Sequence, residues 1–260
     1  MGVASVSCKL RGGRTVLDGL RQQGSMKLLF PRATGASLSG VIINTAGGVT
    51  GEDRFEMTAN VAPGCRMNLT TQAAERAYRA QPQEVAQITN RLTLERQARL
   101  DWLPQELLIY DGSALNRSLR VDMTADARLL IVEPVIFGRA EMGEVLTDIA
   151  FHDRVDVWRD GQLVFADRTR LTGSVSAQLR NPTLGAGCGA MAAVLLVAPD
   201  ADLFLEPVRE RMPPTGGASL IRDGVLFARL LARDGYDLRK TLVPLIELLS
   251  AAPLPGTWMI

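Results

Sequence analysis

The chain has few of the side chains on which most catalytic and metal sites depend. Its 260 residues include one histidine, His152, and three cysteines, Cys8, Cys65 and Cys188. Without a His-x-x-x-His or Cys-x-x-Cys pair, the familiar nitrogen- and sulfur-ligated metal sites are excluded. A Ser-His-Asp or Cys-His mechanism would have to use His152, whose charged neighbours are typical of a surface imidazole.

The cysteines and the apolar segments also bear on location. Three widely separated cysteines form no disulfide framework and suit a reducing cytosol. Residues 1–9 lack the long apolar region of a signal peptide, and no window approaches about 18 unbroken apolar residues. We therefore expect a cytoplasmic protein that does not span or bind a membrane.

Neither sign of charge dominates the composition. Lys+Arg total 29 and Asp+Glu 28, a formal net charge of +1, and the arginines are interleaved with acids. This balance gives no electrostatic reason to expect nucleic-acid binding. Hydrophobic residues make up 47% of the chain and aromatic ones only 5%, so we predict a sizeable core of Leu, Val, Ile, Ala and Met.

Most of residues 1–200 consists of short strand-like runs separated by turn residues. No amphipathic helices intervene, which argues against a doubly wound α/β fold. Many short strands joined by turns are typical of a β-sandwich, barrel or solenoid-like architecture. We therefore predict a mainly β protein, a single large domain over residues 1–260. The predicted strands are Ser37–Asn44, Arg54–Val61, Cys65–Thr71, Gln87–Leu94, Leu107–Tyr110, Leu119–Met123, Leu129–Phe137, Arg154–Arg159 and Gln162–Arg170.

About two helices are expected toward the C-terminal part, at Asp200–Met212 and Asp237–Ser250. In the second, five apolar residues between 238 and 249 fall on one helical face. Pro207 and Pro244 stand inside the two patterns. The pair Asp160-Gly161, flanked by apolar residues, predicts a tight hairpin turn.

The glycine-rich segment Gly185–Ala190 matches the weaker form of the dinucleotide-binding fingerprint. That fingerprint needs a preceding strand and a following amphipathic helix. Here Asn181-Pro182 precedes the segment and the apolar run 192–198 follows it, so a turn before a buried strand is the better interpretation. The sequence also has no Gly-x-x-x-x-Gly-Lys-Ser/Thr phosphate-binding loop.

Carboxylates stand inside two apolar, strand-like runs. If Asp101–Ser113 is extended, Glu106 lies on one face and Asp111 on the other. In Leu129–Phe137, Glu133 is the one acid among eight apolar positions. Burying an unpaired carboxylate costs several kcal/mol or shifts its pKa until it is neutral. Such acids therefore need a basic side chain, a proton or a metal ion as a partner.

Several motifs, taken together, match a known pattern. Gly47–Arg54, Thr70–Arg79 and Trp102–Gly112, the last with its Trp-Leu-Pro-Gln-Glu and Tyr-Asp-Gly stretches, are followed by Phe137-Gly138-Arg139 and Asp223–Arg229. In order and spacing these segments resemble the UreD (UreH) urease accessory proteins over nearly the whole chain. The sequence departs from the family pattern at Glu52, where a glycine is usual, and in residues 41–46, which lack the family's His, Cys or proline.

The resemblance implies a mostly β, non-enzymatic scaffold that helps nickel reach apo-urease. It implies binding to UreF, which brings the GTPase UreG, and docking on the urease apoprotein. A homodimer of this chain within the complex is compatible with the resemblance. An internal polar passage would carry the nickel. No cofactor is expected to be tightly bound, and Ni²⁺ would be held only transiently.

Four carboxylates are candidates for metal transit: Asp53, Glu106, Asp111 and Glu133. Carboxylates are weak ligands for Ni²⁺ compared with imidazole or thiolate, so they would attract the ion and let it go. Ordinary ion pairs would explain the same acids without a metal. The available basic partners are Arg54, Arg76, Arg79 and Arg139.

Two other functions remain open at this point. A hydrolase or lyase could use Glu106 and Asp111 as acid and base, although opposite strand faces would separate them. A structural interaction module, with all its acids in salt bridges, would need no metal.

Overall fold

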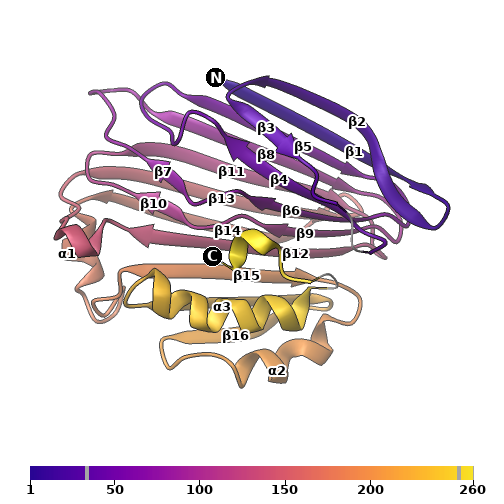
Figure 1. The fold of residues 1–260 in the computed structure, drawn as a ribbon. Coiled ribbons are helices and arrows are strands. Elements are labelled where there is room, and N and C mark those ends of the chain that lie inside the picture. Colours follow the sequence, from indigo (N-terminus) through magenta and orange to yellow (C-terminus); the bar gives the residue numbers. More distant parts are fainter. Residues whose placement is uncertain (33–34, 251–252, 260) are drawn as a thin grey trace.

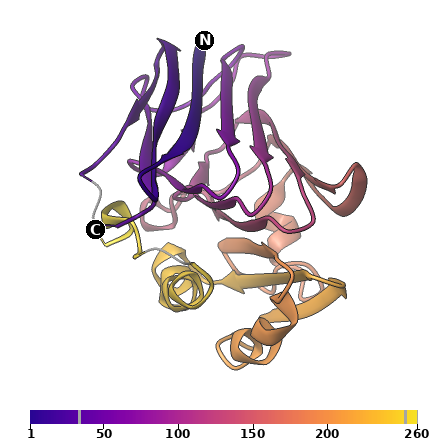
Figure 2. The same cartoon turned by 90° about the vertical axis from the view of Figure 1, so that its right-hand side faces the viewer.

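The chain passes back and forth between two β-sheets, as the ribbon views show (Figures 1 and 2). This computed structural model describes residues 1–32, 35–250 and 253–259. Strands β4, β6, β9 and β12 form parallel neighbours in one sheet, while β5, β8, β11 and β13 do so in the other. Each coil of the chain therefore adds one strand to each sheet, which is a solenoid-like arrangement.

The first sheet has seven strands and ends in antiparallel hairpins on both sides. Its order across the sheet is β14 (Gln162–Gly173), β13 (Ile149–Arg159), β11 (Ala114–Met123), β8 (Ala86–Leu94), β5 (Arg54–Val61), β1 (Gly2–Arg11) and β2 (Arg14–Gly24). The β13–β14 turn is the predicted one: Asp160 and Gly161 both have positive φ, 50° and 75°, as a type I′ hairpin requires.

The second sheet has ten strands. Its main order is β16 (Gly216–Arg222), β17 (Val225–Ala232), β15 (Ala190–Val197), β12 (Arg128–Phe137), β9 (Arg99–Leu103), β6 (Arg66–Thr71), β4 (Leu38–Asn44) and β3 (Met26–Leu29). Two short strands complete it: β10 (Leu107–Ile109) pairs in parallel with β12 and with β7 (Glu75–Ala77).

Helices cover the outer side of the second sheet at its β12–β15–β17 end, in the lower part of Figures 1 and 2. These are α2 (Leu205–Arg209) and α3 (Gly235–Leu249), with the 3-10 turn η2 (Ala201–Phe204). The short helix α1 (Val175–Leu179) lies elsewhere and packs Val175 into the core between the sheets. Two further 3-10 turns are η1 (Ala140–Met142) and η3 (Gly256–Trp258). One apolar core fills the space between the sheets, and a second lies between the β12–β15–β17 strands and α3. These strands are buried on both faces, which explains their continuous apolar runs.

The mainly β prediction is confirmed, and each predicted strand overlaps an observed one. The two predicted helices fare differently. Asp237–Ser250 corresponds to α3, which begins two residues earlier because Asp234 accepts a hydrogen bond from the Asp237 amide at 2.8 Å. Asp200–Met212 is wrong as one helix: it divides into η2 and the five-residue α2.

The condition on which the two faces of Asp101–Ser113 were compared, one continuous extended run, is not met. Strand β9 ends at Leu103, and β10 begins only at Leu107. Pro104 removes a backbone donor, and the two strands pair with different halves of β12: β9 with Arg128–Ile131 and β10 with Val135–Phe137. The interruption therefore lies beside residues 132–134 of β12, which include Glu133.

The α3 layer gives a first testable expectation. Leu242 on α3 is fully buried, whereas Leu203 in η2 is 69% exposed. Leu242→Ala should lower the free energy of unfolding by about 2–5 kcal/mol, because it leaves a cavity between α3 and the sheet. Leu203→Ala should change it by less than about 0.5 kcal/mol. Urea denaturation of both variants measures this, and equal midpoints would contradict the packing.

Candidate functional site

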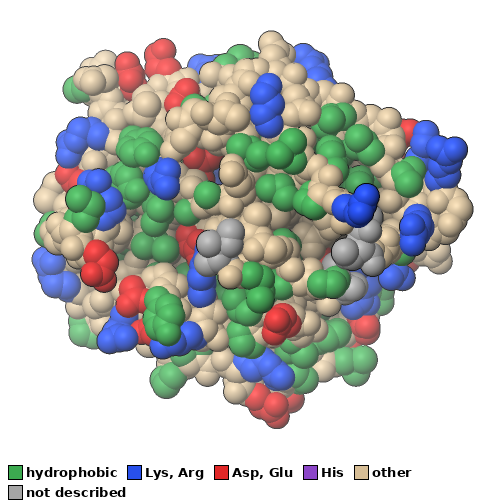
Figure 3. Space-filling view, in the orientation of Figure 1, with side chains coloured by type: hydrophobic (Ala, Val, Ile, Leu, Met, Phe, Trp, Pro, Cys, Tyr) green, Lys and Arg blue, Asp and Glu red, His purple; other side chains and the backbone are tan. Residues whose placement is uncertain are grey.

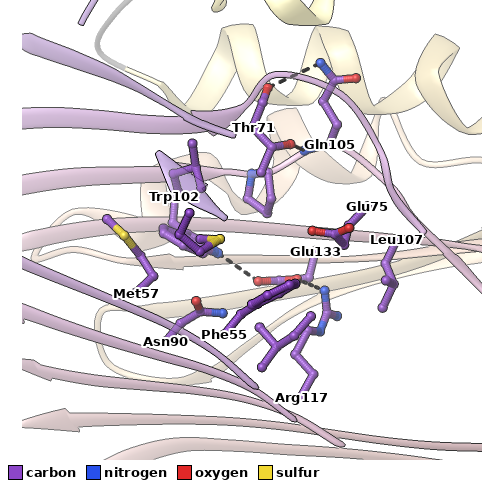
Figure 4. A pocket seen from close by; sticks show the side chains of 14 residues that line it. Phe55, Met57, Thr71, Glu75, Asn90, Trp102, Gln105, Leu107, Arg117 and Glu133 are labelled. Carbon is purple, nitrogen blue, oxygen red and sulfur yellow. Dashed lines mark hydrogen bonds and ion pairs between the residues drawn. The ribbon is translucent and has the colours of Figure 1, made fainter. Parts of the chain in front are cut away.

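A cavity of about 70 Å³ lies between the two sheets, beside the interruption between β9 and β10 (Figure 4). We call it the central cavity. Such a volume holds several waters, since one needs about 10–15 Å³. Its walls combine apolar side chains from both sheets with a few buried polar ones. The polar and charged lining residues are Thr71, Glu75, Asn90, Gln105, Arg117 and Glu133.

Glu133 is the buried acid of this cavity. Its side chain is 5% exposed, and Arg117 from the opposite sheet forms an ion pair with its Oε2 at 2.5 Å. The Trp102 indole N–H donates to Glu133 Oε1 at 2.8 Å. Burial raises the pKa of Glu133 above its usual range, while the Arg117 charge and the Trp102 hydrogen bond oppose that rise. The need for a partner, anticipated from the sequence, is met by an arginine and a tryptophan.

Arg117 holds a second carboxylate at the same time. Its Nε and Nη2 donate to the two oxygens of Asp153 at 3.0 and 2.6 Å, the bidentate geometry that makes such bonds strong. Burial acts to lower the pKa of Arg117, but the charges of Asp153 and Glu133 outweigh it and raise that pKa. The guanidinium therefore stays charged and links the two sheets through Glu133 and Asp153.

Glu75 is a wall residue that the sequence interpretation missed. Asn44 Nδ2 donates to both of its carboxylate oxygens, at 3.1 and 3.2 Å. Burial raises the pKa of Glu75, and the Asn44 and Arg76 hydrogen bonds offset part of the rise. No apolar run surrounds Glu75, so nothing in the sequence marked it as a buried acid. The one feature that could have identified it is its position within the Thr70–Arg79 motif.

Glu75 and Arg117 each belong to a second cavity as well. A space of about 200 Å³, the lateral cavity, shares Glu75 and Thr71 with the central one and includes Asn44. A space of about 420 Å³, the outer cavity, shares Arg117 with it and includes His152 and Asp153. The lateral and central cavities therefore adjoin one another, whereas the outer cavity lies on the other face of the seven-stranded sheet, because the Arg117 side chain points inward with Leu115 and Leu119.

The other three predicted transit residues lie outside these walls. Glu106 forms an ion pair with Arg239 of α3 at 2.6 Å. Asp111 pairs with Arg79 at 2.7 Å and accepts from the Thr147 and Asp148 amides. Partial desolvation acts against ionisation of Asp111, but these amide and Arg79 hydrogen bonds lower its pKa overall.

Asp53 lies in the surface turn after Gly51. It accepts a hydrogen bond from the Thr50 amide at 3.1 Å and is 4.0 Å from the chain's amino terminus. Of the four candidates, only Glu133 lines the central, lateral or outer cavity. Within the described ranges, no group of three or more His, Cys, Asp or Glu side chains is arranged to hold a metal ion.

The two remaining sequence features are placed as follows. Residues Gly185–Gly189 form a turn that leads directly into the buried strand β15, which confirms a turn rather than a dinucleotide site. His152 is half-buried rather than fully exposed, and its Nε2 has no hydrogen-bond partner in the described part of the chain. No helix among the described residues is long and apolar enough to cross a membrane.

Comparison with known proteins agrees with the resemblance. The sequence model of the UreD urease accessory protein family matches residues 1–259. A urease accessory protein UreD from Ruegeria pomeroyi is 47% identical, over 98% of this chain and 99% of its own length. Those from Ruegeria sp. TM1040 and Mesorhizobium japonicum are 45% and 41% identical, over 99% of this chain and 89% and 93% of their own lengths.

These matches define a class of protein that assists urease, since the family's description is that of an accessory protein and not of urease itself. The chain belongs to the UreD urease accessory protein family.

Removal of Arg117 should be strongly destabilising. Arg117→Met would leave Glu133 and Asp153 buried without their cation, at a cost of about 3–5 kcal/mol in the free energy of unfolding. The control is Arg91→Met at an exposed position of β8, where the free energy of unfolding should change by less than about 0.5 kcal/mol. Urea denaturation followed by tryptophan fluorescence compares the variants. An Arg117→Met midpoint equal to that of the wild type would contradict the buried pairing.

Glu75 should make stability depend on pH. Its pKa in the folded chain is raised above 4.5, so the unfolded chain releases this proton first as the pH rises. The free energy of unfolding contributed by Glu75 therefore falls with rising pH above 4.5. Glu75→Gln keeps an acceptor for Asn44 and removes the titration. Relative to the wild type, the variant should gain stability as the pH rises above 4.5; a difference in urea midpoint that does not change with pH would refute this.

Proposed function

We propose that this chain helps deliver nickel to apo-urease and that the adjoining lateral and central cavities are part of the route of the ion. The supporting observation is that the lateral and central cavities share Thr71 and Glu75 in their walls. Glu75 is itself a carboxylate, and the central cavity also contains Glu133, which Arg117 holds. Nickel is the cargo of this route and no cofactor is held permanently.

The carboxylates suit transfer better than storage. Carboxylate oxygens bind Ni²⁺ less tightly than imidazole or thiolate. Within the described ranges, neither Glu75 nor Glu133 belongs to a group of three or more His, Cys, Asp or Glu side chains that could hold the ion. A nickel ion in the central cavity would compete with Arg117 for Glu133, because both are cations on the same oxygens. That competition keeps the affinity for the ion low.

The partners of this function follow from the family. We propose that the chain binds UreF, which brings the GTPase UreG, and docks on the urease apoprotein in the cytoplasm, with neither nucleic acid nor membrane as a partner. GTP hydrolysis would belong to UreG, since this sequence has no phosphate-binding loop. A homodimer within the complex is part of the same proposal.

Two of the predicted transit residues are better explained as structural. Glu106 is 3% exposed and fixes the β9–β10 connection to α3 by accepting from Arg239 Nε and Nη2, at 2.6 and 2.9 Å. Asp111 fixes the Tyr110–Ser113 turn to residues 147 and 148. Each acid is engaged by its own arginine, an arrangement that favours a structural role over acid–base catalysis.

The test is urease activation in cells that carry the complete urease gene cluster. Deletion of this gene should abolish nickel loading, and the wild type should restore it. Glu75→Gln and Glu133→Gln should still assemble with the partners, as affinity purification would show, but urease nickel content and activity should fall. Glu95→Gln is the matched control, because Glu95 is exposed outside all three cavities.

Three outcomes would count against the proposal. Full urease activity in the deletion strain would remove the accessory role. Full activity in both cavity variants would leave the accessory role and remove the route. An equal loss in Glu95→Gln would show that the assay responds to any lost carboxylate.

A further inference from the structure

The outer cavity opens on the outward face of the seven-stranded sheet. Two neighbouring rows of cross-strand partners line it. Gln87, Asn116, His152 and Arg170 form one row, and Ser118, Arg154 and Arg168 the next. Alternate residues of the same strands, such as Leu115, Phe151 and Val155, are buried in the core. Because side chains alternate along a strand, both rows point away from the core.

The lining consists almost entirely of groups that can donate hydrogen bonds. It offers guanidinium, imidazole, amide and hydroxyl groups from the two rows, together with Thr169 between them. Its one carboxylate, Asp153, is already held by both N–H groups that Arg117 donates. Donors without matching acceptors are what an oxyanion requires.

Positive charge is left over in this lining. Arg154 and Arg168 share one acid, Asp156, at 2.6 and 2.5 Å. Desolvation acts against ionisation of Asp156, but hydrogen bonds from Arg168 and Arg154 outweigh it and lower its pKa. Arg170 has no ion pair among the described residues, and His152 Nε2 is buried without a partner.

The surrounding face carries the same sign of charge. On β5, β8, β11, β13 and β14 the outward positions hold six arginines and three carboxylates, although the whole chain has a net charge of only +1. These are Arg54, Arg91, Arg120, Arg154, Arg168 and Arg170, with Glu56, Asp122 and Asp156. By contrast, the face seen in Figure 3 mixes both signs with apolar side chains.

We propose that the outer cavity is a binding site for a small oxyanion of the phosphate type. Its volume of about 420 Å³ lies within the range of ligand pockets. The anion would accept hydrogen bonds from Arg170 and His152 and from the Arg154–Arg168 pair. The two guanidinium groups of that pair keep N–H donors beyond those that bind Asp156 and, for Arg168, the Val155 and Asp167 carbonyls. The surplus of arginine on the sheet would concentrate anions at this face.

Isothermal titration calorimetry with inorganic phosphate tests this site. The full-length chain, joined to a solubility tag, is titrated at constant ionic strength in chloride, with the tag alone as blank. The wild type should bind phosphate saturably. Arg170→Gln should weaken the binding about tenfold, because it removes a charge-assisted donor. His152→Leu should weaken it as well, by removing the imidazole N–H.

Arg91→Gln is the matched control. Arg91 is an exposed arginine of the same face but lies outside the cavity, so its loss should leave the dissociation constant unchanged. Circular dichroism checks that every variant keeps its β structure. Absence of saturable binding by the wild type would overturn the proposal. Equal weakening by Arg91→Gln and Arg170→Gln would also overturn it. The anion would then be attracted by the overall positive charge of the sheet face and not bound in the outer cavity.

Discussion

The arrangement of the two sheets around the central cavity depends on one buried guanidinium, that of Arg117. Arg117 is 9% exposed, and it binds Glu133 of one sheet and Asp153 of the other. A charge so deeply buried is tolerated only with its partners in good geometry. The two sheets must therefore face each other in one register at this point. The space that the interrupted β9–β10 edge leaves beside Glu133 stays polar for the same reason.

The architecture could be predicted from the sequence wherever one face of a strand is buried. Arg54–Val61 alternates exposed and buried residues, and its predicted and observed limits are identical. The pattern fails in β1, where small residues such as Ala4, Ser5 and Ser7 give little contrast between the faces. It fails again at Pro104–Glu106, because the break depends on which part of β12 each strand pairs with. The local sequence does not determine which residues of β12 each strand pairs with.

The candidate site was predictable only in part. The position of Glu133 inside an apolar run predicted a buried charge. Its partner Arg117, however, lies on a strand of the opposite sheet. No spacing rule connects the two. Glu75 stands among alanines and Arg76 rather than in a strongly apolar run, so its contacts follow from Asn44 and the lateral cavity and not from its neighbours in the sequence. Glu106 and Asp111 looked equivalent to Glu133 in sequence, yet each closes a local contact elsewhere.

The sharing of one guanidinium makes the two buried carboxylates interdependent. A cation bound at Glu133 would displace Arg117 from that acid and leave the guanidinium charge to Asp153 alone. By reciprocity, any change that strengthens the Arg117–Asp153 pair favours a cation at Glu133 to the same degree. One arginine thus couples an acid of each sheet to the other.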